Sequence, residues 1–296
     1  MAHMAGPRRD TRGIVEAQEL FARVHFRRRE PAPALRPYLE HYWLIDWDLT
    51  QPYATHVVPH PSVNVVLQQY GDEAAWGEVA GVGLSLFTQK LEGRGRVCGV
   101  QFRPGGFRPF APLRQVSDWT GQRVPVADVL PGADPETIRG ILGLETPGTP
   151  GTPGTSGTSK AVEASEAAAE DARVAALDAF LLGLEPEADP QALRAMRLVD
   201  LVRTDRTILR VAELAAAEGV SVRSLQRLFA SYVGVGPKWV ILRYRIHEAL
   251  ERAELAGGLD WAELAAELGY SDQAHLVRDF TATVGVPPTA YARPAP

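Results

Sequence analysis

Apolar residues recur at helical spacing in the last hundred residues of the chain, and they do so twice. The segment 214–229, LAAAEGVSVRSLQRLF, returns in looser form at 264–280, LAAELGYSDQAHLVRDF. In each copy an apolar helical face is followed by a glycine, Gly219 or Gly269, where a left-handed residue can end a helix. A second apolar face then follows. The pattern predicts two helix-turn-helix units.

The second helix of the first unit is predicted to have an apolar back and a polar front. Advancing about 100° per residue from the apolar Leu225 places Arg223 and Arg227 nearly opposite it. Arginine can pair with guanine O6 and N7, and glutamine with adenine N6 and N7, in the major groove. We therefore predict a DNA-reading helix rather than an ordinary solvated surface. Its flanks carry Ser224 and Gln226, and its N-cap position falls on Ser221.

The second unit has a similar helix with a less polar front. Arg278 points outward with His275 beside it. Gln273 lies in the first turn, where it can reach a phosphate or a base edge. Ser271 or Asp272 can cap this helix, a role that needs no DNA.

A helix is predicted between the two units, over PKWVILRYRIHEALERA at 237–253. About seventeen residues at 1.5 Å each give a stiff spacer of roughly 25 Å. Helices that read consecutive major grooves lie roughly 34 Å apart along one duplex face, so such a spacer suits two groove contacts. Lys238, Arg243 and Arg245 are candidates for phosphate contacts, although two of the three are equally expected to be solvated charges.

This run of motifs resembles the C-terminal domain of the AraC/XylS family of bacterial transcription regulators. The resemblance covers both units, the connecting helix, the GVGPKWV turn and the closing GVPPTAY segment. The second recognition helix departs from the pattern, because Ala274 and Val277 interrupt its outward polar face. The resemblance implies base reading by Arg223, Gln226 and Arg227 in the first unit and by Gln273, His275 and Arg278 in the second.

Charge divides the two units. Residues 206–245 hold seven Lys or Arg against two acidic residues, whereas residues 246–296 hold three against eight. Because phosphate neutralisation dominates affinity for DNA, we hypothesise that the first unit carries most of the binding and the second steers or fine-tunes it.

The front of the chain, residues 24–129, is predicted to be β-rich. Short apolar stretches such as YWLIDWDL, HVVP, VNVVLQQY and RVCGVQFRP alternate with turn residues, which favours a small barrel or jelly-roll-like sheet. It resembles an uncharacterised sensor-type domain found before such DNA-binding modules, most clearly at GVQFRPGGF, residues 99–107. The fold class expected is α+β, with this β domain followed by an all-α double helix-turn-helix domain.

Four segments are expected. Residues 1–20 are a tag scar (MAHM) and an extension, residues 21–135 the β domain, and residues 191–296 the DNA-binding domain. The segment 136–190 is expected to be a linker. It contains a Gly/Pro/Thr tract at 145–160, expected as a disordered surface loop, and a helix at 161–184 that docks on its own chain or, less favourably, on a partner.

Most aromatic residues of the β domain are expected to be core, and some to wall a ligand pocket. Four histidines in this part of the chain lack metal-ligand spacing, so we predict neither metal nor cofactor. The single cysteine, Cys98, lies in an apolar strand where burial keeps thiols inert, and fits a reducing cytoplasm. The candidate ligand-binding residues are Trp43, His60, Arg103 and Phe107; the candidate pocket walls are Tyr42, Trp43, Trp47, Tyr53 and Trp76; the histidines are His25, His41, His56 and His60.

Two functions remain open. In the first, the chain is a transcription regulator whose β domain senses a small molecule. In the second, the β domain serves only for dimerisation or for binding a partner protein. An enzyme is not expected, because no nucleophile elbow, phosphate loop or paired-carboxylate motif is present in the sequence. The expected partner is double-stranded DNA. RNA polymerase, a small-molecule effector and a second copy of the chain are further candidates, and a membrane is not.

Overall fold

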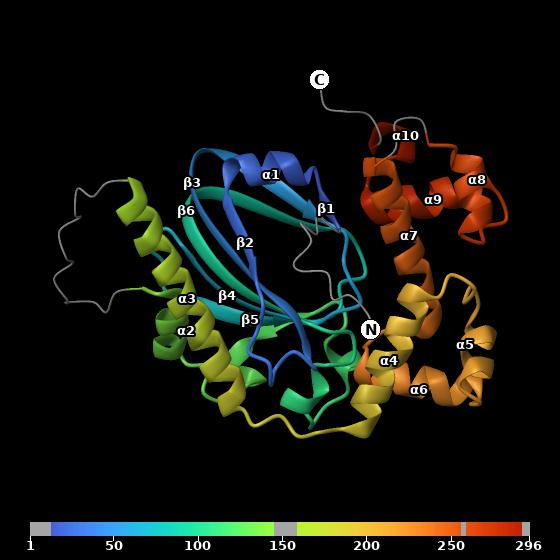
Figure 1. Cartoon of the computed structure of the whole chain (residues 1–296), viewed down its shortest axis with the longest axis horizontal. Coiled ribbons are helices and arrows are strands. Elements are labelled where there is room, and N and C mark those ends of the chain that lie inside the picture. The colour runs from blue at the N-terminus through green and yellow to red at the C-terminus, as the bar shows by residue number, and fades with distance from the viewer. Residues whose placement is uncertain (1–12, 145–158, 256–258, 292–296) are drawn as a thin grey trace.

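The computed structural model describes residues 13–144, 159–255 and 259–291, which form an antiparallel sheet domain beside a helical domain (Figure 1). The extension before residue 13 and the Gly/Pro/Thr tract up to residue 158 lie outside the described residues. The expected division into a β-rich front and an all-helical end is confirmed.

The predicted strands are all present and belong to one sheet. YWLIDWDL and HVVP fall mainly in one long strand, β3, whereas VNVVLQQY and RVCGVQFRP fall mainly in β4 and β6. The order is β1-β3-β6-β4-β5-β7, with β2 pairing a different stretch of β3 from β1. The bounds are β1 (Ile14–Val15), β2 (His25–Arg29), β3 (Leu39–Val57), β4 (Asn64–Tyr70), β5 (Trp76–Ala80), β6 (Phe87–Phe102) and β7 (Arg123–Pro125).

The sheet is open, so of the two expected forms, a small barrel or a jelly-roll-like sheet, the barrel was wrong. Strands β3 and β6 span 19 and 16 residues and curve together, with a register shift between Leu49 and Tyr53. The terminal strands β1 and β7 hold only two and three residues. Such short edges offer too few backbone groups to close a hydrogen-bonded ladder.

The alternation of side chains gives the sheet two different faces. Tyr42 and Leu44 point to one face, which packs against the helices α2 (Pro135–Leu142) and α3 (Ser159–Gly183). The hydroxyl of Tyr42 donates to a carboxylate oxygen of Asp178 in α3 at 2.8 Å, so α3 docks on its own chain (Figure 1). The other face carries Trp43 and Ile45 and is covered in part by α1 (Ala17–Arg23).

Two glycines of β6 make room for indole rings on this second face. Gly99 pairs with Trp43 across the strands, and Gly95 pairs with Trp47. A Cβ at Gly99 would lie 1.9 Å from the ring of Trp43, and a Cβ at Gly95 would lie 2.0 Å from the ring of Trp47. Each indole therefore lies flat against backbone that only glycine leaves open.

The helical domain has two cores joined by one helix, α7. The first half of α7 contributes Val240 and Ile241 to the core around α5 and α6. The second half contributes Ile246 and Leu250 to the core around α8 and α9. The bounds are α4 (Pro190–Thr204), α5 (Val211–Ala217), α6 (Val222–Tyr232), α7 (Pro237–Leu255), α8 (Trp261–Glu267), α9 (Gln273–Val284) and α10 (Pro288–Tyr291).

The segment after β6 joins the two domains. It contains the short 3₁₀ helices η1 (Arg108–Phe110) and η2 (Val116–Trp119), and a third, η3 (Val126–Asp128), follows β7. Arg103 forms an ion pair with Asp200 of α4. The hydroxyl of Thr120 donates to the carbonyl oxygen of Gly234 at 2.7 Å. The recognisable GVQFRPGGF piece therefore forms part of the contact with the helical domain.

We expect Gly99→Ala to destabilise the protein by on the order of 2 kcal/mol or more, because the added methyl group displaces the Trp43 ring. Urea unfolding followed by circular dichroism measures the change.

The matched control is Gly140→Ala, since a Cβ at this helical position meets no atom within 4 Å. That variant should be as stable as the wild type or slightly more stable. Equal stability of the two variants would show that the indole does not lie on Gly99.

Candidate functional site

Helix α6 presents the polar front that its sequence predicts. The hydroxyl of Ser221 caps the helix by accepting from the backbone N–H of Ser224 at 3.1 Å. Leu225 and Phe229 are buried against the core. The DNA-contact candidates Arg223, Gln226 and Arg227 are all exposed, and Ser224 is partly exposed. The helix is thus anchored by its apolar back, and its front is accessible.

The β domain contacts the far end of α6 through two polar side chains. The hydroxyl of Ser231 donates to the side chain of Gln115 at 3.2 Å, and the guanidinium of Arg108 lies 4.5 Å from the centre of the Tyr232 ring. The exposed arginines lie nearer the start of the helix. The β domain therefore holds α6 without covering its front.

Helix α9 has a more acidic start than α6. Its N-cap is Asp272, whose carboxylate accepts from the backbone N–H of His275 at 2.7 Å. This hydrogen bond lowers the pKa of Asp272 below its ordinary value, so the carboxylate is ionised at neutral pH. Gln273 and Arg278 are exposed, whereas His275 is half-buried and lies 3.8 Å from a carboxylate oxygen of Asp279.

Two of the three phosphate candidates on α7 point inward. Arg243 is 6% exposed, donates to the carbonyl oxygen of Leu84 at 3.3 Å and lies over the Trp239 ring. Burial lowers its pKa to about 10, so it remains charged at neutral pH. Arg245 donates to the carbonyl oxygen of Leu209. Of the three, only Lys238 is exposed, so the other two hold the fold together.

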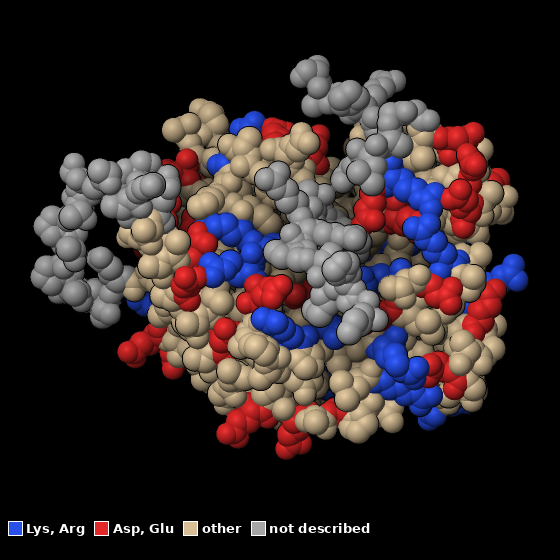
Figure 2. Space-filling model, in the orientation of Figure 1, with Lys and Arg blue, Asp and Glu red and all other residues tan. Residues whose placement is uncertain are grey.

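Helices α6 and α9, the second helices of the two units, lie toward opposite ends of α7, and α7 therefore holds them apart (Figure 1). The nineteen residues of α7 correspond to roughly 28 Å at 1.5 Å per residue. Figure 2 shows basic side chains gathered over α4 and α6 and also along α7, and acidic ones over α8. On this face the acidic side chains of the helical domain are thus most concentrated at the second unit.

A cavity of about 250 Å³ lies on the second face of the sheet. Trp43 and His60 line it, as expected of pocket residues. Arg103 and Phe107 do not: Arg103 is paired with Asp200, and Phe107 is buried against Phe102. Among the aromatic candidates, Trp47 also lines the cavity, Tyr42 faces the opposite side, Tyr53 is half-buried beside α1, and Trp76 is exposed.

Sequence reasoning missed several polar side chains in this wall, including Arg28, Gln68, Gln101 and Arg123. It considered His41 only as a metal ligand. Strand alternation carried the signal, since Arg28 alternates with Arg27 and Arg29 along β2. The alternation separates the side chains of one sheet face from those of the other, but it does not say which face holds a cavity.

The loops that close the cavity also contact α7. Pro59 and His60 belong to the β3–β4 loop, and the ring of His60 stacks on that of His247 in α7, with centroids 4.0 Å apart. Gly81 and Gly83 belong to the β5–β6 loop. The next residue, Leu84, accepts the hydrogen bond from Arg243. Helix α7 therefore contacts a residue of the cavity wall, His60, and a direct neighbour of the wall in the sequence, Leu84.

The other expectations for the β domain concern metal and thiol chemistry. Across residues 13–144, 159–255 and 259–291, no group of three or more His, Cys, Asp or Glu is arranged to hold a metal ion. Burial raises the pKa of Cys98 to about 11, and its thiol is fully enclosed. No helix in the described part of the chain is long and apolar enough to cross a membrane.

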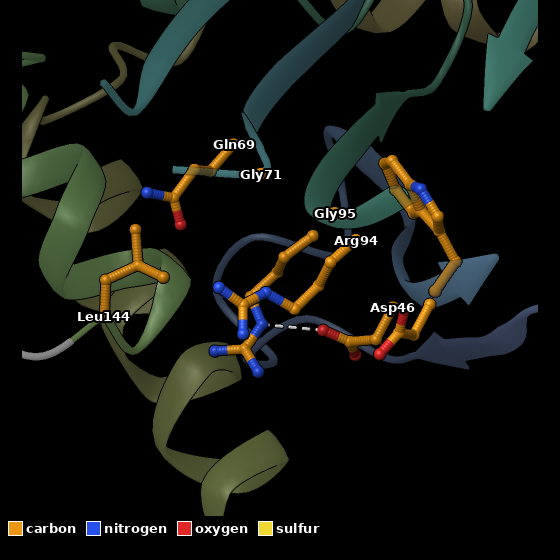
Figure 3. Close-up of a pocket in the computed structure, with 9 residues that line it drawn as sticks. Asp46, Gln69, Gly71, Arg94, Gly95 and Leu144 are labelled. Atoms are coloured by element: carbon orange, nitrogen blue, oxygen red, sulfur yellow. Dashed lines mark hydrogen bonds and ion pairs between the residues drawn. The ribbon is translucent and has the colours of Figure 1, made fainter. Parts of the chain in front are cut away.

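A second, larger hollow of about 490 Å³ lies near the carboxylate of Asp46 (Figure 3). Burial raises the pKa of Asp46, but the guanidinium groups of Arg173 and Arg96 together lower it by more. The pKa of Asp46 is therefore below its ordinary value. Arg27 also pairs with this carboxylate. Because the charges here neutralise one another and tie α3 to the sheet, we assign this hollow a structural role.

Two family models match the chain. Residues 214–294 match a helix-turn-helix domain. Residues 27–125 match a domain of unknown function, DUF6597. No curated protein matches the chain.

Several solved structures are similar to the chain. The C-terminal domain of AraT, a response regulator from Geobacillus stearothermophilus, matches at 23% identity over 33% of this chain and 81% of its own, with a TM-score of 0.31. ToxT from Vibrio cholerae matches at 11% identity over 85% of this chain and 97% of its own, with a TM-score of 0.42. ToxT with a bound unsaturated fatty acid matches at 14% identity over 89% and 96%, with a TM-score of 0.43.

We expect acid to destabilise the protein partly through His41. Burial, followed by the nearby Arg28 and His60, lowers the pKa of His41 from 6.5 to about 3. As the pH falls below 6.5, the unfolded chain takes up a proton that the folded chain does not bind until about pH 3. The free energy of unfolding therefore falls, by at most about 1.4 kcal/mol per pH unit from this group.

Urea unfolding at several pH values between about 7 and 5 measures this loss. His41→Gln should flatten the pH dependence. A His41→Gln variant with the wild-type pH dependence would contradict the assignment.

Proposed function

We propose how the two helix-turn-helix units of this AraC-type DNA-binding transcription regulator share the binding of DNA. Residues 214–294, which contain both units, match a helix-turn-helix domain. The first helix-turn-helix unit supplies most of the affinity for DNA, and the second adjusts it. A small molecule in the β-domain cavity changes how the two units engage the duplex. The observation that carries the effector part is the cavity whose closing loops contact α7.

The front of α6 supplies the base-reading side chains of the proposal. Arg223 and Arg227 carry guanidinium groups that suit guanine O6 and N7, and Gln226 suits adenine. All three are exposed on one accessible helix. Ser221, Ser224 and Lys238 lie at the ends of α6 and α7, where hydroxyl and ammonium groups contact phosphates. The first unit thus combines base reading with charge neutralisation.

The second unit carries more negative charge at its recognition helix, α9, than the first unit carries at α6. Its recognition helix begins at an ionised carboxylate, Asp272, whereas α6 begins at the neutral Ser221. The imidazole of His275 is engaged by Ser271 at 3.2 Å and faces Asp279. Negative charge at these positions repels the phosphates that α9 approaches. Gln273, His275 and Arg278 are therefore proposed to adjust binding rather than to supply it.

The proposed effect of a small molecule depends on side chains of the β domain that belong to the cores of the helical domain. Val82 of the β5–β6 loop belongs to the core of the first unit, and Val58, at the end of β3, belongs to the core of the second. Both segments border the cavity. A ligand that binds one arrangement of these loops more tightly than another therefore biases the position of α7. The cavity favours this sensing role over a role in dimerisation or partner binding alone.

We expect Arg227→Ala to weaken binding to a duplex selected from a random pool by roughly 5- to 150-fold, because a bidentate base contact contributes about 1–3 kcal/mol. Arg278→Ala should weaken it by less than about threefold. Fluorescence anisotropy at several salt concentrations measures both effects and the salt dependence.

The control is Arg94→Ala, which removes another exposed arginine from β6, where it pairs with Asp72. It should bind DNA as the wild type does. Equal losses in the Arg227 and Arg278 variants would refute the dominance of the first unit. A wild-type protein that binds no duplex even at low salt would refute the proposed function itself.

A further inference from the structure

Helix α4 places two arginines beside the recognition helix of the first unit. Arg194 and Arg197 are three positions apart and therefore lie on the same side of α4. The adjoining side of α4 is buried in the core of the first unit, together with residues of α6, and it includes Ala195, Leu198 and Val199. This shared core fixes the position of the two arginines relative to α6.

A hollow of about 270 Å³ lies between α4 and α6. Arg194 and Gln191 line it from α4, whereas Ser224 and Arg227 line it from α6. The last two residues are candidates for DNA contact. On the face seen in Figure 2, basic side chains gather over the same two helices. The hollow therefore continues the exposed front of α6 onto α4.

The two arginines share one carboxylate, that of Glu218, the residue after α5. Its two oxygens each accept from an Nη atom of Arg197 at 2.8 Å, and one of them lies 3.7 Å from the Nε atom of Arg194. Two positive charges and one negative charge give these three side chains a net charge of +1. The side chain of Glu218 is 9% exposed and that of Arg197 is 62% exposed, so the positive charge faces solvent.

The walls of a major groove lie close to the flanks of a helix inserted into it. The groove is about 12 Å wide, and a helix with its side chains is about 10–12 Å across. An element packed against the flank of the inserted helix therefore meets the sugar-phosphate strand at the edge of the groove. Helix α4 occupies such a position relative to α6.

We propose that Arg194 and Arg197 form a site for a DNA phosphate, so that α4 is a third DNA-contacting element beside the two helix-turn-helix units. Helix α4 ends before residue 214, where the match to the helix-turn-helix domain begins. The proposal rests on the DNA-binding function proposed above and adds a backbone contact outside the groove. Because the site binds phosphate and no base edge, it contributes affinity for any sequence and no preference between sequences.

Glu218 has two effects on this site. It orients the guanidinium of Arg197, which carries five N–H donors and so keeps donors for a phosphate while it pairs with the carboxylate. The negative charge of Glu218 also repels that phosphate. Removing the charge of Arg197 and removing the charge of Glu218 therefore change the affinity for DNA in opposite directions.

Anisotropy titrations of the full chain with two duplexes test the site. One duplex is selected from a random pool, and the other is a scrambled sequence of equal length. Arg194→Gln and Arg197→Gln should each weaken binding to both duplexes by the same factor, about threefold or more at low salt. Each should also reduce the slope of log affinity against log salt by about 0.9. Arg227→Ala should instead reduce the preference for the selected duplex.

Two further variants separate a phosphate contact from a structural ion pair. Glu218→Gln should tighten binding to both duplexes by about twofold or more, because it removes negative charge beside the phosphate. Arg94→Gln is the matched control, since this side chain of the β domain is 68% exposed and pairs with one carboxylate, that of Asp72. It should bind both duplexes as the wild type does.

The inference is overturned if Arg194→Gln and Arg197→Gln bind both duplexes as the wild type does, if they weaken only the selected duplex, or if Glu218→Gln weakens binding as they do. The second result would show that the arginines act by positioning α6, and the third that the ion pairs only hold α4 and α5 together. In all three cases the wild type still binds DNA, so the proposed function stands. A wild type that binds neither duplex at low salt removes the proposed function and, with it, the site.

Discussion

Residues of the β domain take part in the cores of both helix-turn-helix units, on the two halves of α7. The core of the first unit includes Val82 from the β domain, and the core of the second includes Val58. Between them, the buried guanidinium of Arg243 reaches the carbonyl of Leu84. A well-packed interior transmits displacement because it has few voids to absorb it. The β domain is therefore packed against the helix that separates the two helix-turn-helix units.

The two faces of the sheet serve different purposes. One face is closed by α2 and α3 and by ion pairs around Asp46, and it is a conventional core. The other face is left partly hollow, because the indoles of Trp43 and Trp47 lie flat on glycine instead of filling the space above the sheet. The apolar residues packed on the first face thus hold together a sheet whose second face contains the cavity. This division follows from the period-two alternation of β3 and β6.

Charge assigns different roles to similar elements. Both units share one architecture, yet α6 begins at a hydroxyl and displays exposed arginines, whereas α9 begins at a carboxylate and faces Asp279. The arginines of β2 are also divided by position, since Arg28 lines the cavity while Arg27 and Arg29 pair with acidic side chains on the opposite face. Position, rather than residue type, decides which arginines lie at the surface or in the cavity wall and which hold the fold together.

The sequence by itself determined the helices of the two units and of the segment between them, the Ser221 cap and the exposed front of α6, because helical period, Gly219 and Ser221 act within a few residues of one another. It also determined the strands and the alternation of their side chains. Only the tertiary structure decided that the sheet stays open, that Arg243 turns inward and that Arg103 pairs with Asp200, 97 positions away. Pairing of strand edges and of distant charges depends on how separate segments meet in space, and no local pattern of residues encodes that meeting.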